Sequence, residues 1–84
     1  MNDDELLQRT IIEAQNALGL GSEPGQLYER RGGSKGWDEA ISKNVFEARF
    51  HVWRAMTIID IEMDAETGEV VASHEVYNGN LSGH

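Results

Sequence analysis

Three carboxylates near the C-terminal end of the sequence alternate with apolar residues, and a fourth follows in the next turn: Asp60, Glu62, Asp64 and Glu66. On a strand the first three would share one face, because side chains alternate between faces. Such a row could hold a hard cation, or raise the pKa of one member for acid–base catalysis. Acidic rows are more often the solvated face of a sheet, and this spacing does not match an EF-hand loop. We therefore predict a surface for a protein partner, with no metal and no cofactor.

Other residue types capable of catalysis are scattered. The three histidines, His51, His74 and His84, form no metal-binding pair, and His74 is predicted on an apolar strand face. No serine has a His and an Asp that the sequence places beside it. The absence of cysteine excludes disulfides, thiolate zinc sites and thiol nucleophiles. We predict no catalytic residues, which favours a protein that is not an enzyme.

A glycine-rich basic segment is the second candidate site. Arg30, Arg31 and Lys35 lie among glycines, and Trp37 follows. Glycine lets backbone amides approach a phosphate, but the order of a Walker loop is missing. Two interpretations of this segment remain. It could contact phosphate or RNA, with Trp37 stacking on a base, or it could be a solvated linker. An exposed Trp37 would also suit a protein interface, so these four residues join the predicted partner-binding set.

Helical spacing predicts one amphipathic helix over 3–18. Its apolar stripe contains Leu7, Ile11, Ala14 and Leu18. Asn2 is the predicted N-cap, and Gly19 or Gly21 the C-terminal stop. Residues 19–36 hold six glycines and the only proline, and we predict a flexible loop there.

Residues 37–56 fit two periods. The apolar residues make a helical stripe, yet those of 46–52 also alternate with polar ones. Aromatic and β-branched content favours a strand, with a short helical turn at 37–43 as a further option. The following residues predict a β-hairpin with Gly68 at positive φ, in which Met63 pairs with Val70, Ile61 with Ala72 and Ile59 with His74. The sheet is thus predicted to extend over 44–77. Residues 78–84 are predicted to form a frayed tail.

The apolar residues change from even to odd positions between 52 and 59, without a turn signal. One long strand with a β-bulge would explain the change, and its first half would then need another partner. This leads to the hypothesis that strand 45–53 pairs with its copy in a homodimer.

Length and charge limit the classes of function. The chain has 84 residues and a formal charge of −8, distributed as −5 over 1–29, +3 over 30–54 and −6 over 55–84. One domain is all that it can hold, and the acidic total argues against nucleic acid as main ligand. No basic-then-apolar leader and no long apolar run are visible, so we expect a cytoplasmic protein without a membrane span.

The hairpin segment 59–71 resembles the end of a PepSY domain, through Asp64, Thr67, Gly68 and Val70. The resemblance covers about a quarter of the chain, and we take it as a clue to fold. It implies a small helix-plus-sheet module of a family linked to regulation of proteases.

Together these patterns predict a single α+β domain over 1–84, with an N-terminal amphipathic helix packed on a small antiparallel sheet that ends in a hairpin. The leading functional hypothesis is a non-enzymatic interaction or regulatory module that presents its acidic hairpin and Trp-bearing loop to a protein with a basic surface. One alternative is an acidic nucleic-acid mimic that blocks a DNA-binding protein. Another is a small dimeric enzyme or ligand-binding protein with a pocket between subunits around His51, His74 and Arg49.

Overall fold

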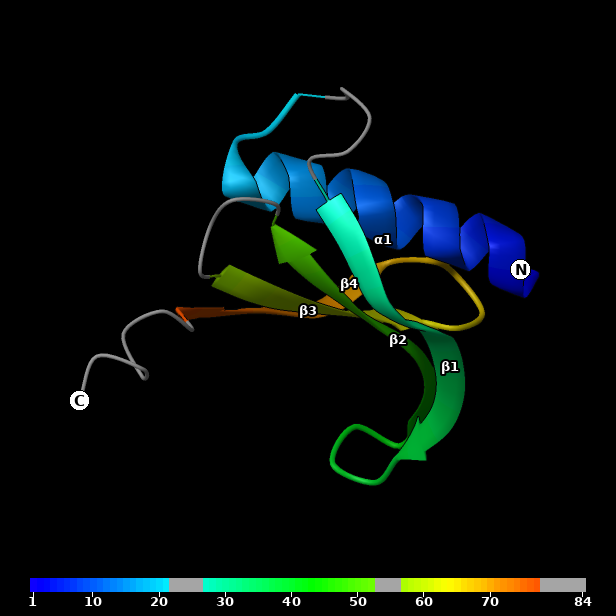
Figure 1. Cartoon of the computed structure of the whole chain (residues 1–84). Helices are drawn as coiled ribbons and strands as arrows, with labels where there is room; N and C mark the ends of the chain where they lie inside the picture. The colour runs from blue at the N-terminus through cyan, green and yellow to red at the C-terminus, as the bar shows by residue number, and fades with distance from the viewer. Residues whose placement is uncertain (22–26, 53–56, 78–84) are drawn as a thin grey trace.

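One helix lies on one face of a four-stranded antiparallel sheet (Figure 1). The computed structural model describes residues 1–21, 27–52 and 57–77, except for the side chains of 28–32, 76 and 77. The helix is α1 (Asp3–Leu18), and the strands are β1 (Leu27–Asp38), β2 (Lys43–Val52), β3 (Thr57–Asp64) and β4 (Val70–Tyr77). The strands follow one another across the sheet in chain order. The predicted α+β class with a C-terminal hairpin is confirmed.

The ends of α1 follow the predicted caps. The Asn2 side chain accepts a hydrogen bond of 2.8 Å from the backbone N–H of Glu5, and three acidic residues occupy the first turn. Gly19 ends the helix at a φ of 69°, in the left-handed region where glycine lacks the strain of a Cβ. The fully buried residues of the helix are Leu6, Thr10 and Ala14, so only Ala14 of the predicted stripe is fully buried. The other stripe residues, Leu7, Ile11 and Leu18, are partly buried and pack against the core.

The core lies between α1 and the two central strands. From β2 it receives Phe46, Ala48 and Phe50, and from β3 it receives Ile59, Ile61 and Met63. These residues alternate with exposed or half-buried polar ones, so both strands have one apolar face. The strand interpretation of 44–52 is therefore confirmed over the helical one.

The predicted loop over 19–36 is wrong from Leu27 onward, because β1 occupies that stretch and pairs with β2. The register of this pair shifts twice, between Glu29 and Arg31 and between Arg31 and Ser34. Irregular pairing of this kind suits a glycine-rich edge strand. Residues 39–42 form a turn rather than a helix, stabilised by a 2.9 Å hydrogen bond from the Ala40 N–H to Asp38 Oδ1.

The dimer hypothesis for strand 45–53 loses its basis. β2 lies between β1 and β3, so both of its edges are paired within the chain. The change of apolar phase is also explained without a bulge, because β2 and β3 are separate antiparallel neighbours. The connection at 53–56 and the predicted tail at 78–84 lie outside the described residues.

The hairpin of β3 and β4 has the predicted turn but a different register. Gly68 has a φ of 74°, and Met63 pairs with Val70 as predicted. The register then shifts between Glu62 and Met63, so that Ile61 pairs with Ser73 and Ile59 with Glu75. His74 consequently lies opposite Asp60, and the prediction that it faces the apolar side is wrong.

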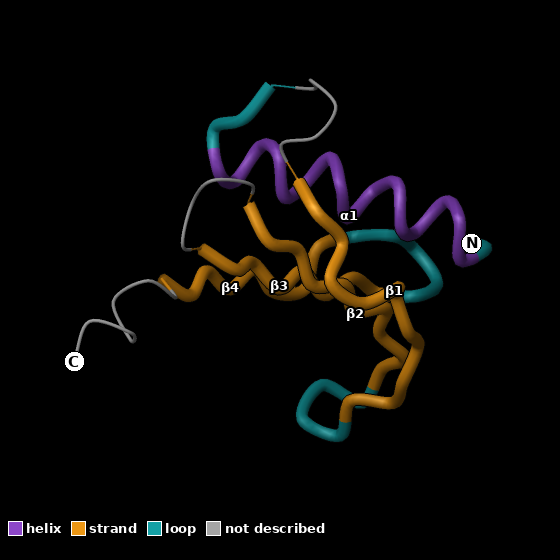
Figure 2. The backbone as a smooth tube through the Cα atoms, viewed as in Figure 1, coloured by secondary structure: helices purple, strands orange, loops and turns teal. Residues whose placement is uncertain are grey.

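The sheet has two unlike faces. The turn end of the β1–β2 hairpin curls away from α1 (Figure 2). We call the side opposite α1 the open face; by the alternation of the strands it carries Glu47, Arg49, His51, Asp60, Glu62 and His74. In the part of the chain that the structure describes, no helix is long and apolar enough to cross a membrane.

Candidate functional site: a carboxylate-lined hollow

The open face contains a hollow of about 290 Å³ at the curled end of the β1–β2 hairpin. Four carboxylate residues are part of its wall, together with one tryptophan and one lysine: Asp38, Glu39, Glu47, Glu62, Trp37 and Lys35. Ser34, Gly36 and Val45 complete the lining. The hollow therefore has a strongly acidic wall, to which a tryptophan residue also contributes.

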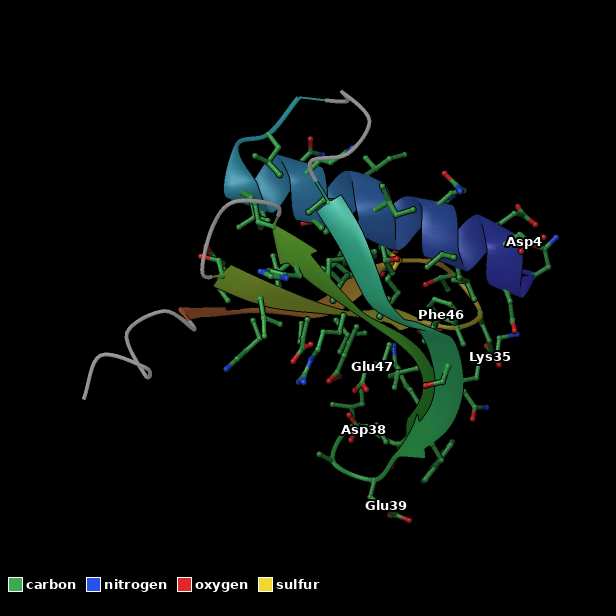
Figure 3. The ribbon with its side chains drawn as sticks, in the orientation of Figure 1. Asp4, Lys35, Asp38, Glu39, Phe46 and Glu47 are labelled. Carbon is green, nitrogen blue, oxygen red and sulfur yellow. The ribbon has the colours of Figure 1, made fainter. Side chains whose placement is uncertain are left out.

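Strand pairing brings these residues together. Glu47 of β2 pairs with Glu62 of β3 on one side and with Ser34 of β1 on the other. Paired residues on neighbouring strands point to the same face of a sheet, so the two glutamates lie side by side. Asp38 and Glu47 lie on the inner side of the curled hairpin, whereas Phe46 and Lys35 lie toward α1 (Figure 3).

Crowding of like charges is visible at Glu62. Partial burial raises the pKa of this carboxyl group, and the charges of Glu47, Asp38 and Asp60 raise it further, against a smaller lowering by His74. The ionised form is therefore disfavoured unless a cation balances it. A positive group in the hollow would relieve this repulsion.

Trp37 and Lys35 belong to β1 rather than to a loop. Trp37 is 56% exposed, which is unusual for so large an apolar side chain. The Lys35 Nζ lies 3.0 Å from Asp3 Oδ1 at the start of α1. Because Asp3 balances this ammonium, the carboxylates dominate the charge of the hollow.

Asp60 and the neighbouring basic residues form a separate group on the open face. Asp60 accepts two hydrogen bonds from the Arg49 guanidinium, at 2.5 and 2.8 Å, and this contact raises the pKa of Arg49. His51 lies beside Arg49 on β2, and His74 pairs with Asp60 across β3 and β4. The Asp60 carboxylate is thus paired with Arg49 on the open face, outside the wall of the hollow.

Asp64 is the last residue of β3, and Glu66 lies in the turn that follows it. Asp64 Oδ1 accepts hydrogen bonds from the backbone N–H groups of Glu66 and Thr67, at 2.8 and 3.3 Å. Its Oδ2 lies 3.1 Å from Lys43 Nζ. These contacts lower the pKa of Asp64 and use its carboxylate to stabilise the turn, while the side chain of Glu66 is exposed.

Of the predicted partner-binding residues, the structure thus brings Trp37, Lys35 and Glu62 to one hollow and places Asp60, Asp64 and Glu66 outside its wall. Arg30 and Arg31 lie in β1, with side chains outside the described part. Sequence reasoning missed Asp38, Glu39 and Glu47. The available signal was the alternation of Glu47 with apolar residues in the predicted strand, which placed it on the face away from the helix.

The described residues contain no group of three or more His, Asp or Glu side chains arranged to hold a metal ion. Comparison with protein-family models, curated proteins and solved structures finds no match. The resemblance of the β3–β4 hairpin to PepSY domains therefore stays a prediction.

Proposed function

We propose that this protein is a non-enzymatic interaction module that receives a cationic side chain of a protein partner in the carboxylate-lined hollow. One observation supports the proposal above all: Trp37 and Glu62, 25 positions apart in the sequence, line the same hollow with three further carboxylates. The proposal keeps the predicted class of function and moves its centre from the hairpin turn to the open face.

The chemistry of the wall favours a guanidinium or ammonium group. Glu47 and Glu62 offer adjacent carboxylates, and Asp38 and Glu39 extend the acidic wall to the hairpin turn. An exposed indole beside these carboxylates could attract the same cation through its π face. Arginine fits best, because its planar guanidinium both donates several hydrogen bonds and stacks on aromatic rings.

The direct test is calorimetric titration with a synthetic acetyl-Gly-Arg-Gly-Arg-Gly-amide peptide. We expect the double variant Glu47→Gln, Glu62→Gln to weaken binding by about tenfold or more, since the loss of even one hydrogen bond to a charged group costs roughly 1.5–3 kcal/mol. The matched control is Glu5→Gln, Glu69→Gln, which changes the net charge equally at exposed positions outside the hollow. Equal weakening by both double variants would show a general charge effect and contradict a specific site.

A second readout is pH. Cation binding favours the ionised form of Glu62, whose pKa is raised in the free protein. Binding should therefore strengthen as pH rises through the pKa of Glu62, with uptake of the peptide coupled to release of a proton. Binding that stays constant over this range would exclude Glu62 from the site.

The nucleic-acid mimic makes a different prediction in the same experiment. A mimic would bind a DNA-binding protein in competition with DNA and would depend on many spread carboxylates. The Glu47 and Glu62 variant would then behave like its control. We also propose that this protein is located in the cytoplasm. Neither of the two binding tests depends on that location.

A further inference from the structure

Among the residues that the structure describes, no strand pairs with the outer edge of β4, and this edge is the more regular of the two edges of the sheet. After the register shift at Met63, six consecutive pairs join β3 to β4, from Glu62 with Ala72 to Thr57 with Tyr77. β1, the other edge strand, has two register shifts and also packs against α1. An open edge presents unpaired backbone N–H and C=O groups. Proline and lysine, which commonly protect such edges, are absent from β4.

A second hollow, of about 330 Å³, lies beside the first residues of β4. Its wall comes from α1, β3, the β3–β4 turn and the start of β4, and consists of Arg9, Ile12, Glu13, Met63, Gly68 and Val70. Ile12 is 55% exposed and Val70 43% exposed, although both are large apolar residues. α1 packs mainly on β1, β2 and β3, which leaves this space open next to the edge.

The part of the chain that forms this edge is acidic. Residues 55–84 contain six acids and no lysine or arginine. On the open face, Glu62 pairs with Ala72, whose small side chain is all that separates Glu62 from the edge. A long basic side chain on an added strand could therefore extend over Ala72 to Glu62. A second copy of this chain would instead bring another acidic β4 to the edge.

From these observations we propose that an extended segment of a protein partner adds to β4 as a fifth strand. Its apolar side chains face α1, where one of them enters the hollow at Ile12 and Val70. Its alternate residues are lysine or arginine and lie on the open face. Backbone hydrogen bonds would supply affinity, and the two faces would supply specificity. This surface shares Glu62 with the carboxylate-lined hollow of the proposed function, but it lies on the β4 side of that residue and does not use Trp37.

The test uses acetyl-Lys-Val-Lys-Leu-Lys-Val-Lys-amide and two N-methylated forms of it, one methylated at the lysines and one at the apolar residues. Alternate residues of a strand direct their N–H groups to the same edge, so each form blocks one edge of the peptide. We expect the unmodified peptide to bind and to slow hydrogen exchange of the β4 amides. One methylated form should bind with the same affinity as the unmodified peptide, and the other should bind more weakly by about tenfold or more.

Two protein variants test the apolar contact. Ile12→Lys should weaken peptide binding about tenfold, as expected for the loss of one buried apolar contact. Ile41→Lys is the matched control, because Ile41 is also exposed but lies in the β1–β2 turn. Trp37→Ala should leave binding of this peptide unchanged, which separates the edge from the proposed function.

Three results would overturn the proposal. The first is equal affinity of the two methylated forms, because a strand uses only one edge to join a sheet. The second is protection of β1 amides instead of β4 amides. The third is a dimeric mass of the free chain in light scattering with its β4 amides already protected, because the edge would then belong to a second copy.

Discussion

Glu62 and Asp64 lie two residues apart on β3, and their pKa values shift in opposite directions. Glu62 is partly buried among other carboxylates, which raises its pKa. Asp64 accepts two backbone N–H groups and faces Lys43, which lowers its pKa. The same residue class thus serves two purposes. The Glu62 charge is disfavoured by burial and by neighbouring carboxylates, which suits the binding of a cation, whereas the Asp64 charge stabilises the fold itself.

Glu62→Gln should raise the thermal stability at pH 7 by a few degrees. Because the folded pKa of Glu62 lies above its ordinary value of 4.5, the native state binds the proton more tightly than the unfolded state does. Stability therefore falls as pH rises from about 4.5 through the folded pKa, and glutamine removes this loss. Melting curves between pH 3 and 8 check this, with Glu69→Gln as control. A lower melting temperature for Glu62→Gln at pH 7 would refute it.

Asp64→Ala should lower the melting temperature by several degrees at pH 7, since the turn loses its side-chain acceptor and Lys43 its partner. The folded pKa of Asp64 is lowered below 3.8, so its contribution is present above that pH and disappears as pH falls through the folded pKa. The difference in melting temperature between the wild type and Asp64→Ala should therefore become smaller at acidic pH. Glu66→Ala, an exposed change in the same turn, is the control. If this difference in melting temperature were the same at all pH values, the charge of Asp64 would make no contribution to stability.

Among the elements, β1 and β2 are joined by an unusually close contact. A Cβ placed on Gly33 would lie 1.8 Å from Cζ of the buried Phe46 ring. The absence of a side chain at this position therefore lets the ring lie directly against the backbone of β1. The contact explains why a glycine-rich segment can cover the core as a strand.

Gly33→Ala should destabilise the fold by about 1–3 kcal/mol, the usual cost of an overpacked core. For a domain of this size each kcal/mol corresponds to a change in melting temperature of roughly 4–8 °C. Gly36→Ala is a matched control in the same strand, because a Cβ there meets no atom within 4 Å. Denaturant unfolding of the two variants gives the comparison. Equal stability of both would show that Phe46 adjusts without cost.

Helix α1 and the β3–β4 hairpin were predictable because local signals specify them. Asn2 and Gly19 cap the helix, and Gly68 supplies the positive φ of the turn. β1 was not predictable, since its residues show no apolar alternation and its stability comes from pairing with β2 and from the Gly33–Phe46 contact. Distant contacts of this kind leave no periodic pattern in the sequence.

The candidate site was predictable only in part for the same reason. The alternation of Asp60 and Glu62 with apolar residues correctly placed them on the face away from the helix. That Trp37 and Glu62 line one hollow depends on the pairing of β1 with β2, and that His74 faces Asp60 depends on one extra residue in β4. A register shift by a single residue reverses the face of each later side chain.

For the whole molecule, the excess of acidic residues sets the response to salt. With 15 Asp and Glu against 7 Lys and Arg, self-repulsion should outweigh surface ion pairs such as Lys35–Asp3, each of which contributes little. We expect the melting temperature at pH 7 to rise as NaCl increases from 0.02 to about 0.5 M, since the screening length falls with ionic strength. The rise should be smaller for the Glu47→Gln, Glu62→Gln variant. A melting temperature that falls with NaCl would instead show that ion pairs dominate.

The order of the strands also determines how the chain can reach its fold. Because each strand pairs with the next one along the chain, every step of sheet assembly closes only a short loop, at low entropic cost. A long-range contact joins α1 to the β3–β4 turn, where Arg9 donates to the Gly68 carbonyl across 59 residues. Folding rates fall as contacts become more distant in sequence. The meander can therefore form quickly by itself, and docking of the helix is the step that joins the first part of the chain to the last.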